Sequence, residues 1–148
     1  MDDSRPMPRF TTLPDDDARA LLSRNHVGRL AFSFHDRVDI QPLHYVRDGD
    51  WLYGRTEVGS KLATLAHHGW CALETDEIRG LFDWDSVVVR GSFQILDPEL
   101  GSADAYKRGI ELLRNFVPGA LTEDDPTPKR LVVFRIHIDE ISGRSARR

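Results

Sequence analysis

Four residues with the chemistry of a phosphate site lie close together in the sequence: Arg55, Thr56, Ser60 and Lys61. They follow Gly54, where an alternating aromatic pattern typical of a strand (51–53) ends, and they lead into helical spacing of apolar residues (62–66). The start of a helix offers free backbone N–H groups and a positive dipole end, which together with two cations would suit a dianionic phosphate. The alternative is a surface turn capped by Thr56 or Ser60, since the stretch has no P-loop or dinucleotide fingerprint.

Metal and nucleophile chemistry have no comparable pattern in this chain. His26, His35 and His44 show no H-x-x-x-H spacing, and His67 and His68 are adjacent, so metal binding is not expected. The Gly-Ser-Lys stretch of the predicted phosphate site lacks the flanking pattern of a hydrolase elbow. The single cysteine has apolar neighbours, so it is expected in the core, and it rules out an internal disulfide.

Length and charge limit the class of protein. The 148 residues are enough for one domain with a hydrophobic core, and the formal net charge of −4 argues against broad nucleic-acid binding. No apolar run is long enough to span a bilayer, and the N-terminus lacks a signal-peptide pattern. The sequence therefore predicts a single domain without nucleic-acid or membrane partners, located in the cytoplasm.

Local spacing predicts the elements that must position these residues. A short helix is expected from an N-cap at Thr12 to about Asn25, and a second helical region from Asp97 to Val117, stopped by Pro118. Six strands are expected at residues 27–34, 38–46, 51–53, 70–77, 86–96 and 131–138. Six antiparallel strands with short helices at their connections predict a closed or nearly closed barrel.

Two connections between these strands have features of their own. The helix that follows the predicted phosphate site is expected to end at Gly69, which can adopt the left-handed conformation of a C-terminal cap. The connection before the fifth strand carries three bulky apolar residues, Leu81, Phe82 and Trp84. So much exposed apolar surface is unusual in a monomer, and it favours burial against a partner chain.

The order of these segments resembles that of a known family. The stretches that carry the resemblance are Gly28–Phe32, Ile40–Val46, Tyr53–Leu65, Cys71–Glu77 and Trp84–Gly91. Their succession is similar to that of the pyridoxamine 5'-phosphate oxidase-like flavin-binding split barrels, and in particular to the small proteins related to the nitroimidazole-resistance group. The resemblance implies a mainly β fold with short helices. It predicts a six-stranded antiparallel split β-barrel over residues 13–143, between an N-terminal arm (1–12) and a C-terminal tail (144–148).

The resemblance also implies where a flavin would bind. In the family, the junction of strand, turn and helix holds the phosphate of flavin mononucleotide (FMN), and the second strand passes beside the isoalloxazine ring. Trp84 and Ser86 match positions that, in related homodimers, reach the flavin bound mainly by the other subunit. The implied cofactor-binding residues are Gln41, Pro42, Leu43, His44, Tyr53, Arg55, Thr56, Ser60, Lys61, Trp84 and Ser86.

The chain also departs from its relatives at two places. The oxidase itself carries a longer basic C-terminal region, whereas this chain ends soon after Arg144, which argues against oxidation of vitamin B6. Nitroimidazole-resistance proteins commonly have a histidine where this chain has Gly54 and Arg55, which argues against nitroreduction by that route. His44 is the candidate catalytic residue, and the alternative is an inward histidine satisfied by a neighbour.

The resemblance as a whole implies an FMN-dependent oxidoreductase that acts on a small molecule, as a homodimer with flavin at the subunit interface. Two other functions stay open at this point. The protein could bind flavin without catalysis, or the barrel could hold a deazaflavin or haem instead. The cations Arg55 and Lys61 favour a phosphate-bearing ligand over haem, but they do not separate flavin from deazaflavin.

Overall fold

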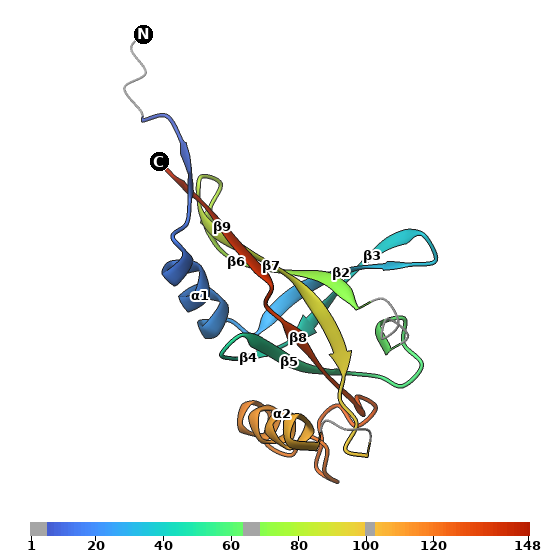
Figure 1. Ribbon diagram of the computed structural model, residues 1–148. Coiled ribbons are helices and arrows are strands. Elements are labelled where there is room, and N and C mark those ends of the chain that lie inside the picture. Colours follow the sequence, from blue (N-terminus) through green and yellow to red (C-terminus); the bar gives the residue numbers. More distant parts are fainter. Residues whose placement is uncertain (1–5, 64–68, 100–102) are drawn as a thin grey trace.

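The computed structural model describes residues 6–63, 69–99 and 103–148, which form a mainly β protein with two helices beside a long antiparallel sheet (Figure 1). The elements in chain order are β1 (Arg9–Thr12), α1 (Asp15–Arg24), β2 (Val27–Phe34), β3 (Arg37–His44), β4 (Val46–Asp48), β5 (Trp51–Thr56), β6 (Trp70–Gly80), β7 (Asp83–Ile95), α2 (Ala103–Phe116), β8 (Val132–His137) and β9 (Glu140–Arg147). The described residues thus contain nine strands, where the sequence predicted six.

The sheet follows the path β3-β2-β6-β7-β8-β5-β4, with β9 paired to both β1 and β7. The two ends of this path are consecutive in the chain, because only Tyr45 separates β3 from β4. The Tyr45 side chain is buried, and its hydroxyl donates to the carbonyl oxygen of Leu22 (2.7 Å). Tyr45 therefore fixes the bend between the two edges of the sheet. No strand pairing between described residues joins these edges, so the barrel, which the sequence predicted to be closed or nearly closed, is not closed.

Strand β7 contributes to two parts of the sheet. Its first part, Trp84–Arg90, pairs with β9, and its last part, Phe93–Ile95, pairs with β8. Between them the backbone at Gly91 passes so close to the end of β8 that a Cβ atom would lie 1.6 Å from the carbonyl oxygen of His137. Only glycine allows such an approach, so Gly91 marks the point where the sheet divides.

The core is filled by inward-facing apolar residues of the strands, as their alternation predicted. Fully buried members of the main cluster are Leu30, Leu52, Leu73, Val89, Phe134 and Ile136. Helix α1 buries Ala18, Leu21 and Leu22 against the sheet. Helix α2 lies over β5 and β8 and covers a second cluster, made of Tyr53, Leu96, Leu113 and Val133.

Both chain termini differ from the sequence prediction. Helix α1 begins at Asp15 with Pro14 at the N-cap position and no side-chain cap, so the predicted cap at Thr12 is wrong. Thr12 is instead the last residue of β1, where it pairs with Arg144 of β9. Strands β1 and β9 thus lie partly in the segments predicted as an arm and a tail. Pattern analysis missed β9 because its sequence, EISGRSAR, contains little apolar alternation.

The apolar connection predicted between the fourth and fifth strands is a tight hairpin. Strand β6 runs to Gly80 and β7 begins at Asp83, so Leu81 and Phe82 alone form the turn. Leu81 is 81% exposed, while the Phe82 ring packs edge-on against Phe10, with ring centroids 6.3 Å apart. The bulky residues therefore lie at the tip and flank of a long β ribbon (Figure 1).

Candidate functional site

A cleft of about 300 Å³ lies where β3 passes the end of β5. The structure brings together six residues that the sequence predicted: Gln41, Pro42, Leu43, Arg55, Thr56 and Ser60. Glu57 and Arg130 complete the lining and were not predicted. The chain runs on from β3 through Tyr45 into β4, and β4 pairs with β5. This connection brings residues 41–43 and residues 55–60 to the same cleft.

The guanidinium of Arg55 is already occupied by a carboxylate. Arg55 and Asp125 form a two-pronged ion pair in which their side chains are 7% and 2% exposed. The same guanidinium donates to Thr127 Oγ1 (2.8 Å), and the hydrogen bond from Arg55 holds the pKa of Asp125 well below its usual value. Asp125 thus balances the charge of Arg55 and accepts two of its hydrogen bonds, while the predicted contact of Arg55 with a phosphate stays a prediction.

The two hydroxyls of the junction, those of Thr56 and Ser60, lie side by side at the cleft. Thr56 Oγ1 lies 3.1 Å from Ser60 Oγ, and Ser60 Oγ accepts a hydrogen bond from the backbone N–H of Ala63 (3.0 Å). Ser60 thus caps the helical turn that starts at Leu62, which is the role expected in the surface-turn alternative. A capping oxygen that accepts from a backbone N–H keeps its own proton for donation, so capping and anion binding are compatible. The rest of the predicted helix (64–68) lies outside the described residues.

Lys61 lies at the edge of this site and does not line the cleft. Its ammonium contacts Asp39 Oδ2 at 2.9 Å, and the Lys61 side chain is 60% exposed. The hydrogen bond from Lys61 lowers the pKa of Asp39. An exposed ion pair contributes little free energy, so this contact can be exchanged for another anion.

Arg130 is the cation that the sequence analysis missed. It is half-buried, lines the cleft, and places Nη1 at 3.4 Å from Nδ1 of His44. Within the described part of the chain, no carboxylate forms an ion pair with Arg130. Its position just before β8, in a stretch that reads only as a polar loop, offers no sequence signal for a binding residue.

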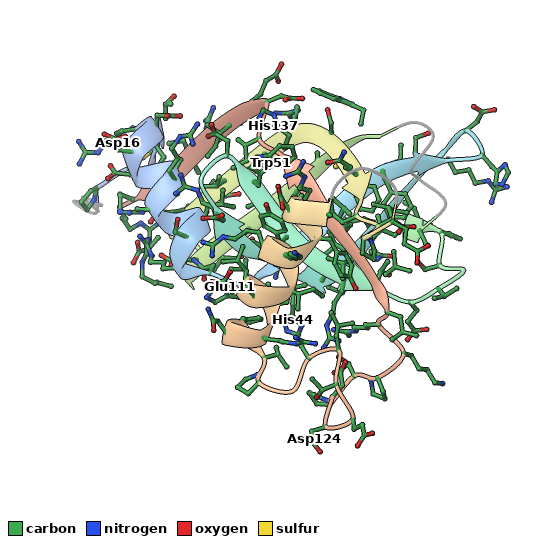
Figure 2. All side chains as sticks on the ribbon, turned by 60° about the horizontal axis from the view of Figure 1, so that its bottom comes forward. Asp16, His44, Trp51, Glu111, Asp124 and His137 are labelled. Carbon is green, nitrogen blue, oxygen red and sulfur yellow. The ribbon has the colours of Figure 1, made fainter. Side chains whose placement is uncertain are left out.

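A second pocket, of about 140 Å³, adjoins the first and shares Arg55 and Arg130 with it. His44 lines this pocket, and Figure 2 shows it between α2 and the loop that carries Asp124. Partial burial lowers the pKa of His44, and the nearby positive charges of Arg130, His26 and Arg55 lower it further. His44 therefore faces a pocket as a neutral imidazole at pH 7, while its catalytic role stays a prediction.

The Tyr53 side chain belongs to the core. It is 3% exposed and packs under α2 with Leu113 and Val133, and it lines neither pocket. The Tyr53 side chain therefore does not reach the cleft in this chain, and its predicted contact with a cofactor stays a prediction. The alternation of β5 is consistent with this placement, because Tyr53 and Thr56, which lines the cleft, are an odd number of positions apart and point to opposite faces of the strand.

Trp84 and Ser86 lie on the β6–β7 ribbon, outside both pockets. The Trp84 ring contacts Phe10 (centroids 6.2 Å apart), and Ser86 Oγ donates to Glu74 Oε2 (2.8 Å). Within one chain neither residue can touch a ligand in the cleft. Their predicted contact with the flavin of a partner subunit stays a prediction.

The described residues offer little support for metal binding or for chemistry at a reactive cysteine. No group of three His, Cys, Asp or Glu side chains there could hold a metal ion. Cys71 is buried, and burial raises the pKa of its thiol to about 12, which leaves it unreactive. None of the helices in the described segments has the length and apolar character needed to cross a membrane.

The two end strands of this antiparallel sheet, β3 and β4, follow one another in the chain, and a polar cleft lies beside β3, which is the arrangement of a split barrel. The chain belongs to the pyridoxamine 5'-phosphate oxidase family, whose profile matches residues 14–145. The match covers nearly all of the chain, so the resemblance predicted from the sequence is confirmed.

Known proteins similar to this chain include members with a described cofactor. An FAD-binding protein from Mesorhizobium loti is 26% identical, with a TM-score of 0.74 over 96% of this chain and 100% of that chain. A protein of Bacteroides thetaiotaomicron proposed to act in 5-nitroimidazole antibiotic resistance has a TM-score of 0.70 over 95% of this chain and 90% of its own, but at 10% identity it shows the fold alone. An uncharacterized protein of Rhizobium meliloti (strain 1021) is 26% identical over 141 residues, or 88% of this chain and 91% of that protein.

Proposed function

We propose that this protein binds FMN in the cleft beside β3 and acts as a flavin-dependent oxidoreductase on a small molecule. The observation that carries the proposal is the convergence of the strand residues 41–43 with Thr56 and Ser60 on one cleft, in a chain of this family. The Mesorhizobium loti relative is described as FAD-binding. FAD contains the same mononucleotide part as FMN, so the cleft proposed here would serve either flavin, and FMN is the specific expectation.

The backbone of β3 fits the ring edge of a flavin. β3 is the end strand of the sheet path, and among the described strands it pairs only with β2. Backbone N–H and C=O groups along its outer edge are therefore available to the heteroatoms of an isoalloxazine ring. Hydrogen bonds at that edge would tune the electron affinity of the ring, and the bound flavin would supply the two-electron transfer itself.

The hydroxyl pair fits the phosphate. Thr56 and Ser60 would donate to phosphate oxygens, next to the backbone N–H groups of the turn that Ser60 caps. Lys61 would exchange its exposed contact with Asp39 for the phosphate. Arg55 would serve a different purpose from the one predicted, because its pair with Asp125 holds the 122–129 loop against the end of β5.

We further propose that the protein is a homodimer, in which each cleft is completed by the partner subunit. Ile78 and Leu81, which are 70% and 81% exposed on the β6–β7 ribbon, need cover that one chain does not supply. The same ribbon carries Trp84 and Ser86, so it would bring them to the partner's cleft. Sedimentation of the flavin-loaded protein at micromolar concentration should give a dimer, and a monomer would contradict this proposal.

The visible absorption spectrum of the purified protein, followed by mass analysis of its heat-released ligand, tests the flavin proposal. We expect a flavin spectrum and the mass of FMN, while the mass of FAD would correct the cofactor and keep the site. A haem or deazaflavin spectrum, or a colourless protein that takes up neither added FMN nor added FAD, would refute the proposal. Flavin that no nicotinamide cofactor reduces, with no substrate to reoxidise it, would favour a non-catalytic flavin-binding protein.

A further inference from the structure

The second pocket has an apolar wall and a polar mouth. Its wall is formed by residues from the end of α2 and from the 122–129 loop, namely Leu113, Phe116, Val117 and Pro126. His44 and Arg130 stand at its polar side. An engineered protein cavity of about 150 Å³ holds one benzene molecule. At about 140 Å³, this pocket therefore has room for one aromatic ring.

The second pocket carries a positive charge, that of Arg130, which no described residue in its lining neutralises. Arg55 is paired with Asp125, whereas Arg130 has no carboxylate partner among the described residues. Among the described residues, none that lines the pocket is Asp or Glu. An entering carboxylate would therefore meet no like charge, and it could take both donors of the planar Arg130 guanidinium.

The contact between Arg130 and His44 fixes the hydrogen-bonding role of the imidazole. A guanidinium has donors only, so His44 Nδ1, at 3.4 Å from Arg130 Nη1, must accept. The proton of the neutral imidazole is then on Nε2, which remains available to donate to a ligand. Partial burial and the neighbouring positive charges, which lower the pKa of His44, keep this neutral form at pH 7.

We propose that the second pocket is a substrate subsite for a small aromatic carboxylate. The ring of the ligand packs against Phe116 and Val117, and its carboxylate binds Arg130 beside the neutral His44. Because this pocket shares Arg55 and Arg130 with the first cleft, such a ligand lies beside the proposed flavin. Its role as a substrate rests on the proposed flavin function, but its binding to the pocket does not.

Titration calorimetry with benzoate and with its neutral isostere benzamide tests this inference. Each ligand is titrated into the full-length protein as purified, and again into the protein saturated with FMN. We expect a benzoate Kd of about 1 mM or tighter, and benzamide weaker by about tenfold or more. Arg130→Gln should weaken benzoate by about tenfold or more and leave benzamide unchanged. Arg37→Gln is the matched control, because Arg37 is exposed on the β2–β3 hairpin and lines neither pocket.

Three outcomes overturn the inference. Equal affinities for benzoate and benzamide would show that the charge is not recognised, and this comparison needs no variant. Unchanged benzoate affinity in Arg130→Gln would place the anion elsewhere. Benzoate binding that is lost on saturation with FMN would show that the flavin itself occupies the pocket. Failure of FMN to bind, with benzoate binding as expected, would refute the flavin function and leave the carboxylate site in place.

Discussion

Replacement of Thr56 by valine is the sharpest test of the proposed phosphate site. Thr56 is 8% exposed, and valine keeps its shape while it removes the hydroxyl that lies 3.1 Å from Ser60 Oγ. The loss of that neutral hydrogen bond should cost about 0.5–1.5 kcal/mol of folding stability. A hydrogen bond to a charged group contributes about 1.5–3 kcal/mol, so the FMN affinity of Thr56→Val should fall about 10- to 150-fold.

Ser60→Ala separates capping from ligand binding at the same junction. This variant loses the bond from Ala63 N–H as well, so its free energy of unfolding should fall by about 0.5–2 kcal/mol for the cap. FMN affinity is measured by fluorescence quenching, and stability by urea unfolding of the flavin-free protein. Ser142→Ala, an exposed substitution on β9, is the control and should change neither quantity. Unchanged FMN affinity in both Thr56→Val and Ser60→Ala would refute the phosphate assignment.

Three further predictions follow from single contacts. The hydrogen bond from Arg24 lowers the pKa of Glu77 from 4.5 to about 2, so its stabilising contribution should be complete above pH 4.5 and lost towards pH 2. The melting temperature of the wild type minus that of Glu77→Gln should shrink over that interval, and a difference independent of pH would contradict this. Gly91→Ala, which forces a Cβ to within 1.6 Å of the His137 carbonyl oxygen, should cost about 3 kcal/mol in urea unfolding; an unchanged midpoint would show that the backbone yields. The imidazole of His44 should titrate below its ordinary value of 6.5 by NMR, and a higher midpoint would refute its assignment as a neutral donor.

The cleft shows how far local sequence can predict a site. Thr56 and Ser60 were recognisable because a strand pattern, a glycine break and a capping serine follow one another within ten residues. The charge partners were not recognisable in this way. Asp125 lies 70 residues from Arg55, in a loop whose composition is only polar, and the pair converts an expected phosphate ligand into a buried structural contact. Arg130, by contrast, lines two pockets and forms no ion pair with a carboxylate of the described segments.

Strand β9 shows the same limit for the fold. The hairpin turns at 35–36 and 49–50 are local features, and both could be predicted from their residues. By contrast, β9 exists because β1 and β7 offer it edges, and its own residues carry little strand signal. The sequence predicted a closed or nearly closed barrel and could not decide between the two, because closure depends on whether distant strand edges pair.

The sequence by itself determined the mainly β character, the approximate positions of both helices, the apolar faces of the strands that it predicted, and the family. These follow from periodicity, turn residues and segment order, which act over a few residues at a time. Only the tertiary structure decided which arginine is neutralised, that Tyr53 is core, and that His44 and Arg130 share a second pocket. Charge pairing and pocket shape depend on distances between residues far apart in the chain, and local patterns do not encode those distances.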